Sequence, residues 1–175
     1  KNAVKHLQEC ARFCEQKQVI ALLGAASGGL AYGYYLRGDL ENARKQAERA
    51  IQICTEAGTT QWLSLNHLVP GMINLDSGDL KTARSYTEQA LNLALKNGEK
   101  LVEGLSRVFL GRILGKEDIS HSDKAEEYIL EGIKILEERK IVPYSSRGYF
   151  YLGELYADMG QREKSSETLK KAEGA

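Results

Sequence analysis

The sequence has few of the residues that mark several common protein classes. Its 175 residues include only two prolines and three cysteines, and aromatic residues make up 7%. Such a small, odd number of cysteines does not form the dense disulfide framework of a small secreted domain, which favours a reducing, cytoplasmic location. Scarce proline and long stretches without turn residues favour an all-α fold, because sandwiches and barrels need a turn about every 8 to 12 residues.

The sequence also lacks net charge. Lys plus Arg and Asp plus Glu each number 24, so the formal net charge is zero. No overall field therefore attracts nucleic acid or an anionic membrane surface, and no basic cluster supports DNA binding. The stretch from Val19 to Leu36 has no charge over 18 residues, near the lower limit for a membrane-spanning helix. Its four glycines and three tyrosines favour a buried helix over a membrane span.

A repeat of about 40 residues runs through the chain. The clearest pair is GDLENARKQAERAI, residues 38–51, and GDLKTARSYTEQAL, residues 78–91. In this register one column of small residues holds Ala3, Ala43, Ala83, Ala125 and Ser165. A second column, seven positions later, holds Cys10, Ala50, Ala90, Gly132 and Ala172. Positions i, i+4 and i+7 share one helical face, so the columns predict helices that approach each other closely.

The sequence contains a third column of small residues, one in each of the last four repeats. Each of them comes before the first-column residue of its repeat, so we expect this column on the other helix of the pair. It holds Ala31, Gly71, Gly111 and Gly153. The two residues that lengthen the third repeat fall between Gly111 and Ala125, and we expect them in a longer turn within residues 115–122.

This pattern resembles the tetratricopeptide repeat, in which small residues at fixed positions let two helices approach closely. The fourth pair matches best, through Tyr149, Leu152, Gly153, Tyr156, the turn glycine Gly160 and Ala172. The third pair lacks the turn glycine, and the second has Pro70 where the family usually has leucine. The resemblance covers essentially the whole chain. It implies an all-α, right-handed superhelical solenoid of antiparallel helix pairs, with about four pairs and one leading helix.

We expect residues 1–175 to form a single solenoid that is a segment of a longer protein. The predicted repeat units are 1–17 (partial), 18–58, 59–98, 99–141 and 142–175. Turn glycines and caps predict helices over residues 2–15, 18–37, 39–57, 59–77, 79–97, 99–115, 121–139, 142–159 and 161–173. Pro70 lies inside one of these helices, and we expect a bend over residues 66–70. Exposed apolar ends of the array can promote homodimers.

The period is longer than the 34 residues or so of the classical repeat. In this the chain is similar to long-helix solenoids of large bacterial signal-transduction ATPases, including maltose-activator-type regulators and certain cyclases. The resemblance implies a non-catalytic scaffold that binds a protein or peptide, as the regulatory segment of a larger cytoplasmic signalling protein. It leaves open an effector-sensing domain that binds a small ligand.

The resemblance also indicates a binding surface, because the first helix of each pair lines the concave groove in this family. Carried over by register, the groove residues are Tyr32, Tyr35, Leu65, Leu68, Met72, Asp76, Arg112, Arg147, Phe150, Glu154 and Asp158. One end of this set is apolar and aromatic and the other is charged, which suits an amphipathic peptide. Several of these side chains, Leu65 and Leu68 especially, can equally pack between helices.

Two patterns imitate catalytic or metal sites. Ser27 in GAASGG resembles the serine of a hydrolase elbow, but Ala25 replaces the first glycine and no strands exist to build the sheet that this site needs. His6, Cys10 and Cys14 share one helical face, and we interpret the cysteines as buried thiols because no fourth ligand is evident. The chain has no phosphate-binding glycine loop, CxxC pair or HExxH, so no cofactor or metal is predicted.

Overall fold

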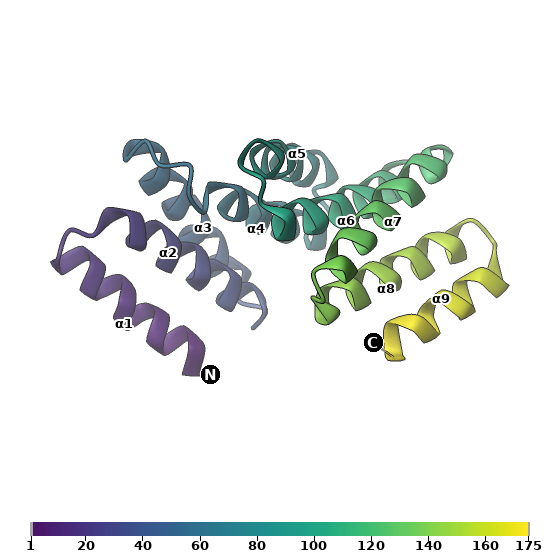
Figure 1. The fold of residues 1–175 in the computed structure, drawn as a ribbon, viewed down its shortest axis with the longest axis horizontal. Helices are drawn as coiled ribbons and strands as arrows, with labels where there is room; N and C mark the ends of the chain where they lie inside the picture. Colours follow the sequence, from purple (N-terminus) through teal and green to yellow (C-terminus); the bar gives the residue numbers. More distant parts are fainter. Residues whose placement is uncertain (1, 175) are drawn as a thin grey trace. The chain divides into compact units, whose positions relative to one another are not determined.

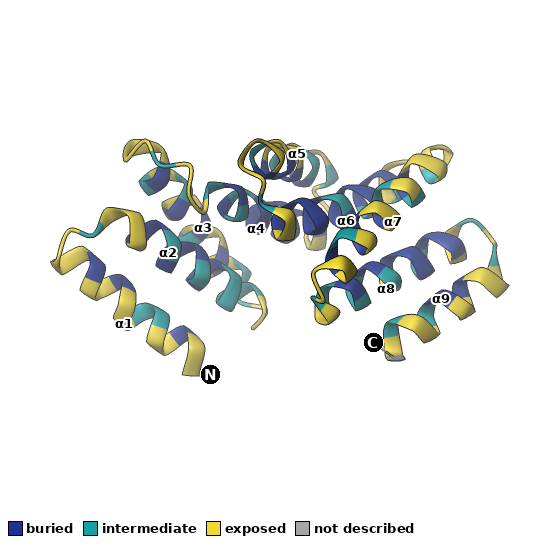
Figure 2. Ribbon diagram, viewed as in Figure 1, coloured by how far each residue is buried: buried dark blue, intermediate teal, exposed yellow. Residues whose placement is uncertain are grey.

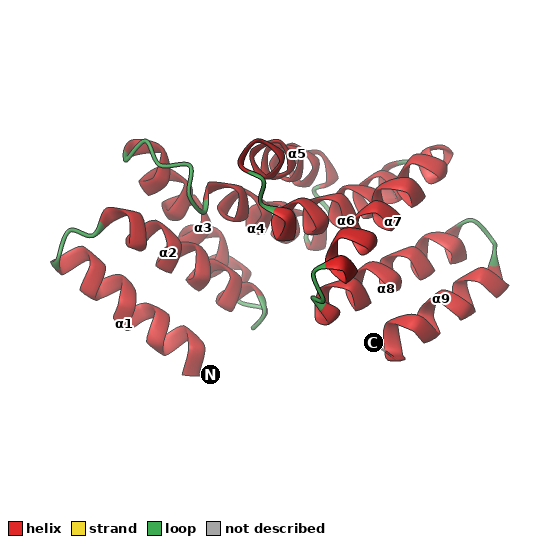
Figure 3. Ribbon diagram, viewed as in Figure 1, coloured by secondary structure: helices red, strands yellow, loops and turns green. Residues whose placement is uncertain are grey.

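The computed structural model describes residues 2–174, and within them every regular element is a helix (Figures 1 and 3). The elements are α1 (Asn2–Gln16), α2 (Ile20–Tyr35), α3 (Leu40–Glu56), α4 (Leu63–Asp76), α5 (Leu80–Asn97), α6 (Lys100–Glu117), the 3-10 turn η1 (Ile119–His121), α7 (Ser122–Glu138), α8 (Val142–Asp158) and α9 (Arg162–Gly174). The all-α prediction is confirmed. No helix in this range combines the length and the apolar character needed to cross a bilayer.

The chain divides into two compact units, Lys1–Leu93 and Ala94–Ala175, and the division falls inside α5. In the first unit α2 packs against α1 and α3, and α3 against α4. In the second unit α7 packs against α6 and α8, and α8 against α9. Each unit is therefore built from neighbouring helices stacked on one another. The assignment of all 175 residues to one continuous solenoid stays a prediction.

One turn geometry recurs between the helices. The backbone has positive φ at Gln18, Gly38, Gly58, Gly78 and Gly98, which are 20 residues apart, and again at Lys140 and Gly160. At Gly38 the amide donates to the Tyr35 carbonyl at 2.9 Å, and the Asp39 amide donates to the Tyr34 carbonyl at 3.0 Å. These two bonds form the Schellman motif, which ends a helix with a residue in the left-handed region.

The aspartate after the turn glycine begins the next helix. The Asn42 amide donates to Asp39 Oδ1 at 3.3 Å, and the Thr82 amide donates to Asp79 Oδ1 at 3.1 Å. Hydrogen bonds from Asn42 lower the pKa of Asp39, and hydrogen bonds from Thr82 lower that of Asp79. The repeated sequence GDL therefore ends one helix and caps the next within two residues.

The small-residue columns are buried where paired helices meet. Ala43, Ala50, Ala83, Ala90 and Ala125 are all 0% exposed. A Cβ built at Gly111 would lie 2.5 Å from the Ala125 carbonyl oxygen, so α6 and α7 touch through their backbones. The predicted close approach of paired helices is confirmed in both units, and Figure 2 shows buried faces on successive helices.

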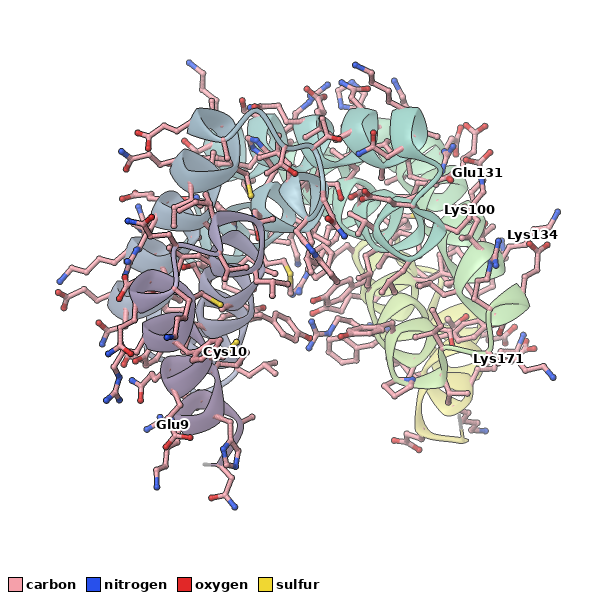
Figure 4. The ribbon with its side chains drawn as sticks, turned by 60° about the vertical axis from the view of Figure 1, so that its left-hand side comes forward. Glu9, Cys10, Lys100, Glu131, Lys134 and Lys171 are labelled. Atoms are coloured by element: carbon pink, nitrogen blue, oxygen red, sulfur yellow. The ribbon has the colours of Figure 1, made fainter. Side chains whose placement is uncertain are left out.

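The first helix is the exception to this pattern. Ala3 and Cys10 occupy the columns but are exposed, and α1 instead buries Val4, Ala11 and Cys14. The prediction that Cys10 is a buried packing residue is therefore wrong. The columns face the first helix of the same pair, and no helix precedes α1 in the described residues. Cys10 is labelled on α1 in Figure 4.

Helix α4 differs from its prediction at its start. It begins at Leu63 rather than residue 59, because Trp62 before it has a φ of 68° and breaks the helical path. Pro70 lies inside the helix, which continues to Asp76. The side-chain amide of Asn74 donates to the Pro70 carbonyl at 2.8 Å. The bend expected over residues 66–70 stays a prediction.

The extra residues of the third repeat form the longer turn that was expected. Helix α6 runs to Glu117, Asp118 is extended with a φ of −160°, and η1 follows before α7. Asp118 Oδ1 accepts from the Ser120 amide at 2.8 Å, which holds this turn in place of the missing glycine.

Candidate functional site

The first helices of two pairs in the second unit, α6 and α8, bring together a charged and aromatic cluster. The guanidinium carbon of Arg112 lies 3.9 Å from the centre of the Tyr151 ring. Arg112 Nη2 lies 3.2 Å from Glu154 Oε2. A cation over an aromatic face is attracted by the quadrupole of the ring, so Tyr151 and Glu154 together fix the position of the guanidinium.

The buried aromatic residues beneath this cluster make it rigid. Tyr151 is 6% exposed and meets the fully buried Phe109 edge to face, with ring centres 5.7 Å apart. Phe150, the preceding residue, has its ring centre 5.9 Å from that of Tyr151 and is 46% exposed. The cluster therefore offers one accessible apolar ring beside a fixed cation.

A second ion pair lies one helical turn further along both helices. Lys116 Nζ lies 3.4 Å from Asp158 Oδ2, and both side chains are more than 40% exposed. Exposed ion pairs contribute little to stability, typically between 0 and about 1 kcal/mol. This pair therefore serves mainly to place opposite charges on an accessible face.

Five polar atoms on these two helices are buried and have no hydrogen-bond partner among the described residues. They are Ser106 Oγ, Arg107 Nε, Arg112 Nε, Arg147 Nη1 and Glu154 Oε2, although Oε2 keeps its charge contact with Arg112. Buried polar groups in native proteins are nearly always paired. These atoms are too deeply buried to contact a ligand, so the binding capacity of this face lies in its partly exposed groups, such as the Arg112 side chain at 21% exposure.

The predicted residues of the first unit form a smaller group on α2 and α4. The rings of Tyr32 and Tyr35 stack with centres 6.2 Å apart and an angle of 25° between their planes. The Tyr35 hydroxyl donates to Asp76 Oδ2 at 2.6 Å. These three side chains lie together as the register indicated.

Other predicted residues of α4 lie deeper. Leu68 is 0% and Met72 is 3% exposed, and Leu65 is half-buried. Burial at this level leaves Leu68 and Met72 no surface for a ligand, so they pack between helices, which was the alternative left open. The accessible members of the set are thus the aromatic and charged ones.

A second surface lies between α3 and α5 in the first unit, over α4, where sequence analysis selected no site. It is an open groove of about 740 Å³. Its lining residues are mostly of polar type, although most of the surface that they present to the groove is apolar: Glu48, Ile51 and Gln52 from α3, His67 from α4, and Lys81, Thr82, Ser85, Tyr86 and Gln89 from α5. These side chains lie mainly on second helices of pairs, whereas the family resemblance pointed to first helices.

His67 lies beneath this groove. Its ring centre is 6.0 Å from that of Tyr86, and its Nδ1 is buried without a hydrogen-bond partner. Burial lowers the pKa of His67, because it disfavours the charged imidazolium.

The sequence patterns that resemble a hydrolase serine and a metal site lie on α2 and α1. Ser27 is 0% exposed in the middle of α2, so it lacks the exposed strand-to-helix turn of a hydrolase nucleophile. His6 contacts Glu9 at 3.5 Å, and burial raises the pKa of Cys14. Within residues 2–174, no three His, Cys, Asp or Glu side chains are grouped as metal ligands.

Comparison with known proteins agrees with this architecture. Residues 146–175, which cover most of α8 and α9, match the family model of the tetratricopeptide repeat. A search of curated proteins finds no significant match. Among solved structures, the apo form of RapI has a TM-score of 0.77 at 13% identity, over 98% of this chain and 60% of the RapI chain.

Two further structures have the same fold. BtubC (BKLC) from P. vanneervenii has a TM-score of 0.71 at 16% identity, over 98% of this chain and 71% of that one. A putative kinesin light chain from Podosopora anserina with nearly identical TPR-like repeats has a TM-score of 0.61 at 18% identity, over 98% and 93%. At these identities the likeness shows the fold alone. Residues 146–175 match the tetratricopeptide repeat directly, and the chain as a whole has the fold of tetratricopeptide-like helical repeats.

Proposed function

We propose that this chain is a non-catalytic scaffold that binds a protein or peptide through the first helices of its pairs. One observation carries the proposal. Arg112 is held over Tyr151 at 3.9 Å and beside Glu154 at 3.2 Å, next to the exposed ring of Phe150. A fixed guanidinium beside an exposed aromatic ring is the kind of anchor that dominates binding energy in protein interfaces.

The chemistry of the cluster indicates what it recognises. The guanidinium carries five N–H donors and no acceptor, so it favours carbonyl or carboxylate oxygens of a ligand. Phe150 offers an apolar contact, and Lys116 with Asp158 offers charge of both signs. An amphipathic peptide with an acidic or carbonyl-rich edge meets all three groups. In the first unit, Tyr32, Tyr35 and Asp76 offer a second aromatic and acidic contact.

The wider setting is also part of the proposal. We infer that the chain is the regulatory segment of a larger cytoplasmic signalling protein. Its three free cysteines fit a reducing compartment and support the cytoplasmic part of this inference. A formal net charge of zero argues against nucleic acid as the partner. A homodimer formed through an exposed apolar end of the helix array belongs to the same proposal.

A peptide-display selection with two matched arginine variants tests the binding proposal. Arg112 and Arg107 both lie on α6, both are ion-paired and both have side chains that are 21% exposed. Arg107 pairs instead with Glu103 and Glu131, the latter labelled in Figure 4. We expect Arg112→Gln to weaken selected peptides by at least about tenfold and Arg107→Gln by less than about twofold.

Two results would contradict the proposal. One is a selection that enriches no peptide for the wild-type chain. The other is a set of peptides that lose equal affinity with both arginine variants, while urea unfolding shows that both variants remain folded. The second result would mean that Arg112 acts through stability rather than through ligand contact.

A further inference from the structure

Helices α6 and α8 together carry one more cation than acid. The cations are Lys100, Arg107, Arg112, Lys116 and Arg147, and the acids are Glu103, Glu117, Glu154 and Asp158. All of these acids have a partner, and four of the cations are paired with a carboxylate. Among the described residues, Arg147 has no carboxylate partner. It is therefore the surplus cation of this surface.

Arg147 is not a freely hydrated surface cation. Its side chain is only partly exposed, and its Nη1 atom is buried without a hydrogen-bond partner. A charge held partly away from water costs stability unless an opposite charge compensates it. Arg107 on α6 shows such compensation, since it is also partly exposed and contacts both Glu103 and Glu131. At Arg147 this compensation has to come from an anion outside the described chain.

An exposed aromatic ring lies on the same face of α8. Phe150 follows Arg147 by three residues, a spacing that makes two side chains neighbours on the surface of a helix. Its side chain is 46% exposed. A ligand that reaches the exposed part of the Arg147 guanidinium therefore meets an apolar ring beside it.

The charge balance favours an anion with a single charge. Phosphate groups are typically bound by clusters of arginines. Here Glu154 already balances Arg112, and Asp158 already balances Lys116, so one unpaired cation remains. A carboxylate carries one negative charge and matches the planar fork of a guanidinium.

We propose that Arg147 determines the charge specificity of the surface formed by α6 and α8. It pairs with an aspartate or glutamate side chain of the bound peptide, while Phe150 contacts an apolar residue next to that acid. This inference rests on the proposed scaffold function, because it assigns a ligand group to the same surface. Arg112 does not distinguish an acid from an amide, because Glu154 already balances its charge.

The test measures the coupling between Arg147 and an acid of the ligand. Peptides are selected by display on the full wild-type chain, and the acids of each enriched peptide are changed one at a time to the matching amide. Affinities are then measured for wild type, Arg147→Gln, Arg112→Gln and Arg12→Gln. Arg12 is exposed on α1 in the other unit, so its variant is a control for the loss of one positive charge.

We expect one acid-to-amide change to weaken binding to wild type by at least about tenfold and binding to Arg147→Gln by less than about twofold. Arg112→Gln and Arg12→Gln should keep the tenfold difference between the acid and amide peptides. The urea midpoint of Arg147→Gln should equal or exceed that of wild type, because the variant lacks an uncompensated charge.

The inference is overturned if no acid of any enriched peptide is coupled to Arg147 in this way. A lower urea midpoint for Arg147→Gln would also overturn it, since Arg147 would then serve the stability of the fold. Peptides that respond to Arg112→Gln but not to Arg147→Gln overturn it and leave the scaffold function supported. A selection that enriches no peptide contradicts both proposals.

Discussion

Helices α1 and α7 carry the same columns of the repeat and bury them differently. In α7, Ala125 and Gly132 are buried against α6, the first helix of their own pair. In α1, Ala3 and Cys10 hold the same positions and are exposed. Small residues at helical spacing therefore mark a surface that accepts a partner helix, and the partner helix decides whether the surface is buried.

We expect the largest difference between α1 and α7 when one small residue of each helix is enlarged. A Cβ at Gly132 would lie 2.6 Å from the Gly104 carbonyl oxygen and 2.7 Å from Val108 Cγ2. Because one of these neighbours is backbone, we expect Gly132→Leu to cost about 3 kcal/mol or more, or to prevent folding. Cys10→Leu, at the exposed equivalent, should stay within about 0.5 kcal/mol of wild type.

Circular dichroism followed through urea unfolding measures both variants. Equal midpoints for Gly132→Leu and wild type would contradict the close approach of α6 and α7. A large loss for Cys10→Leu would show that α1 buries its column after all.

The ends of the helices allow a second comparison, between a glycine and a lysine in the same turn geometry, for which we expect a smaller effect. Gly38 and Lys140 end their helices with φ of 74° and 57°. The left-handed region costs a side chain about 1–2 kcal/mol, so Gly38→Ala should destabilise by about 1 kcal/mol. Lys140→Gly should stabilise by up to about 1 kcal/mol, since it removes that strain at a small entropic cost. Changes of the same sign in the two urea midpoints would contradict the recurring turn.

Much of the fold could be predicted from the sequence, because periodicity and turn chemistry are local signals. The pair GDLENAR and GDLKTAR fixes both the period and the caps. The exposed columns of α1 could not be predicted in the same way, since burial depends on a neighbouring helix rather than on the residue itself. The late start of α4 was missed because nothing in the sequence marks Trp62 as left-handed.

The binding surfaces were less predictable than the fold. Register placed Arg112 and Glu154 on neighbouring helices, where they meet at 3.2 Å. The same register selected Leu68 and Met72, which are buried, because it gives the direction of a side chain and not its depth. No sequence pattern indicated the groove over His67, since its polar lining residues look like ordinary solvent-exposed positions of α3 and α5.

The fold depends on close contact between small residues of one helix and the side chains of its partner. A double-mutant cycle at Gly153 and Leu169 tests this contact directly, because a Cβ at Gly153 would lie 2.7 Å from Leu169 Cδ2. We predict that Gly153→Ala destabilises the wild-type chain in urea unfolding, and that Leu169→Ala removes at least about 0.5 kcal/mol of that loss. If the two changes add without coupling, the helices do not nest through these columns and the account is wrong.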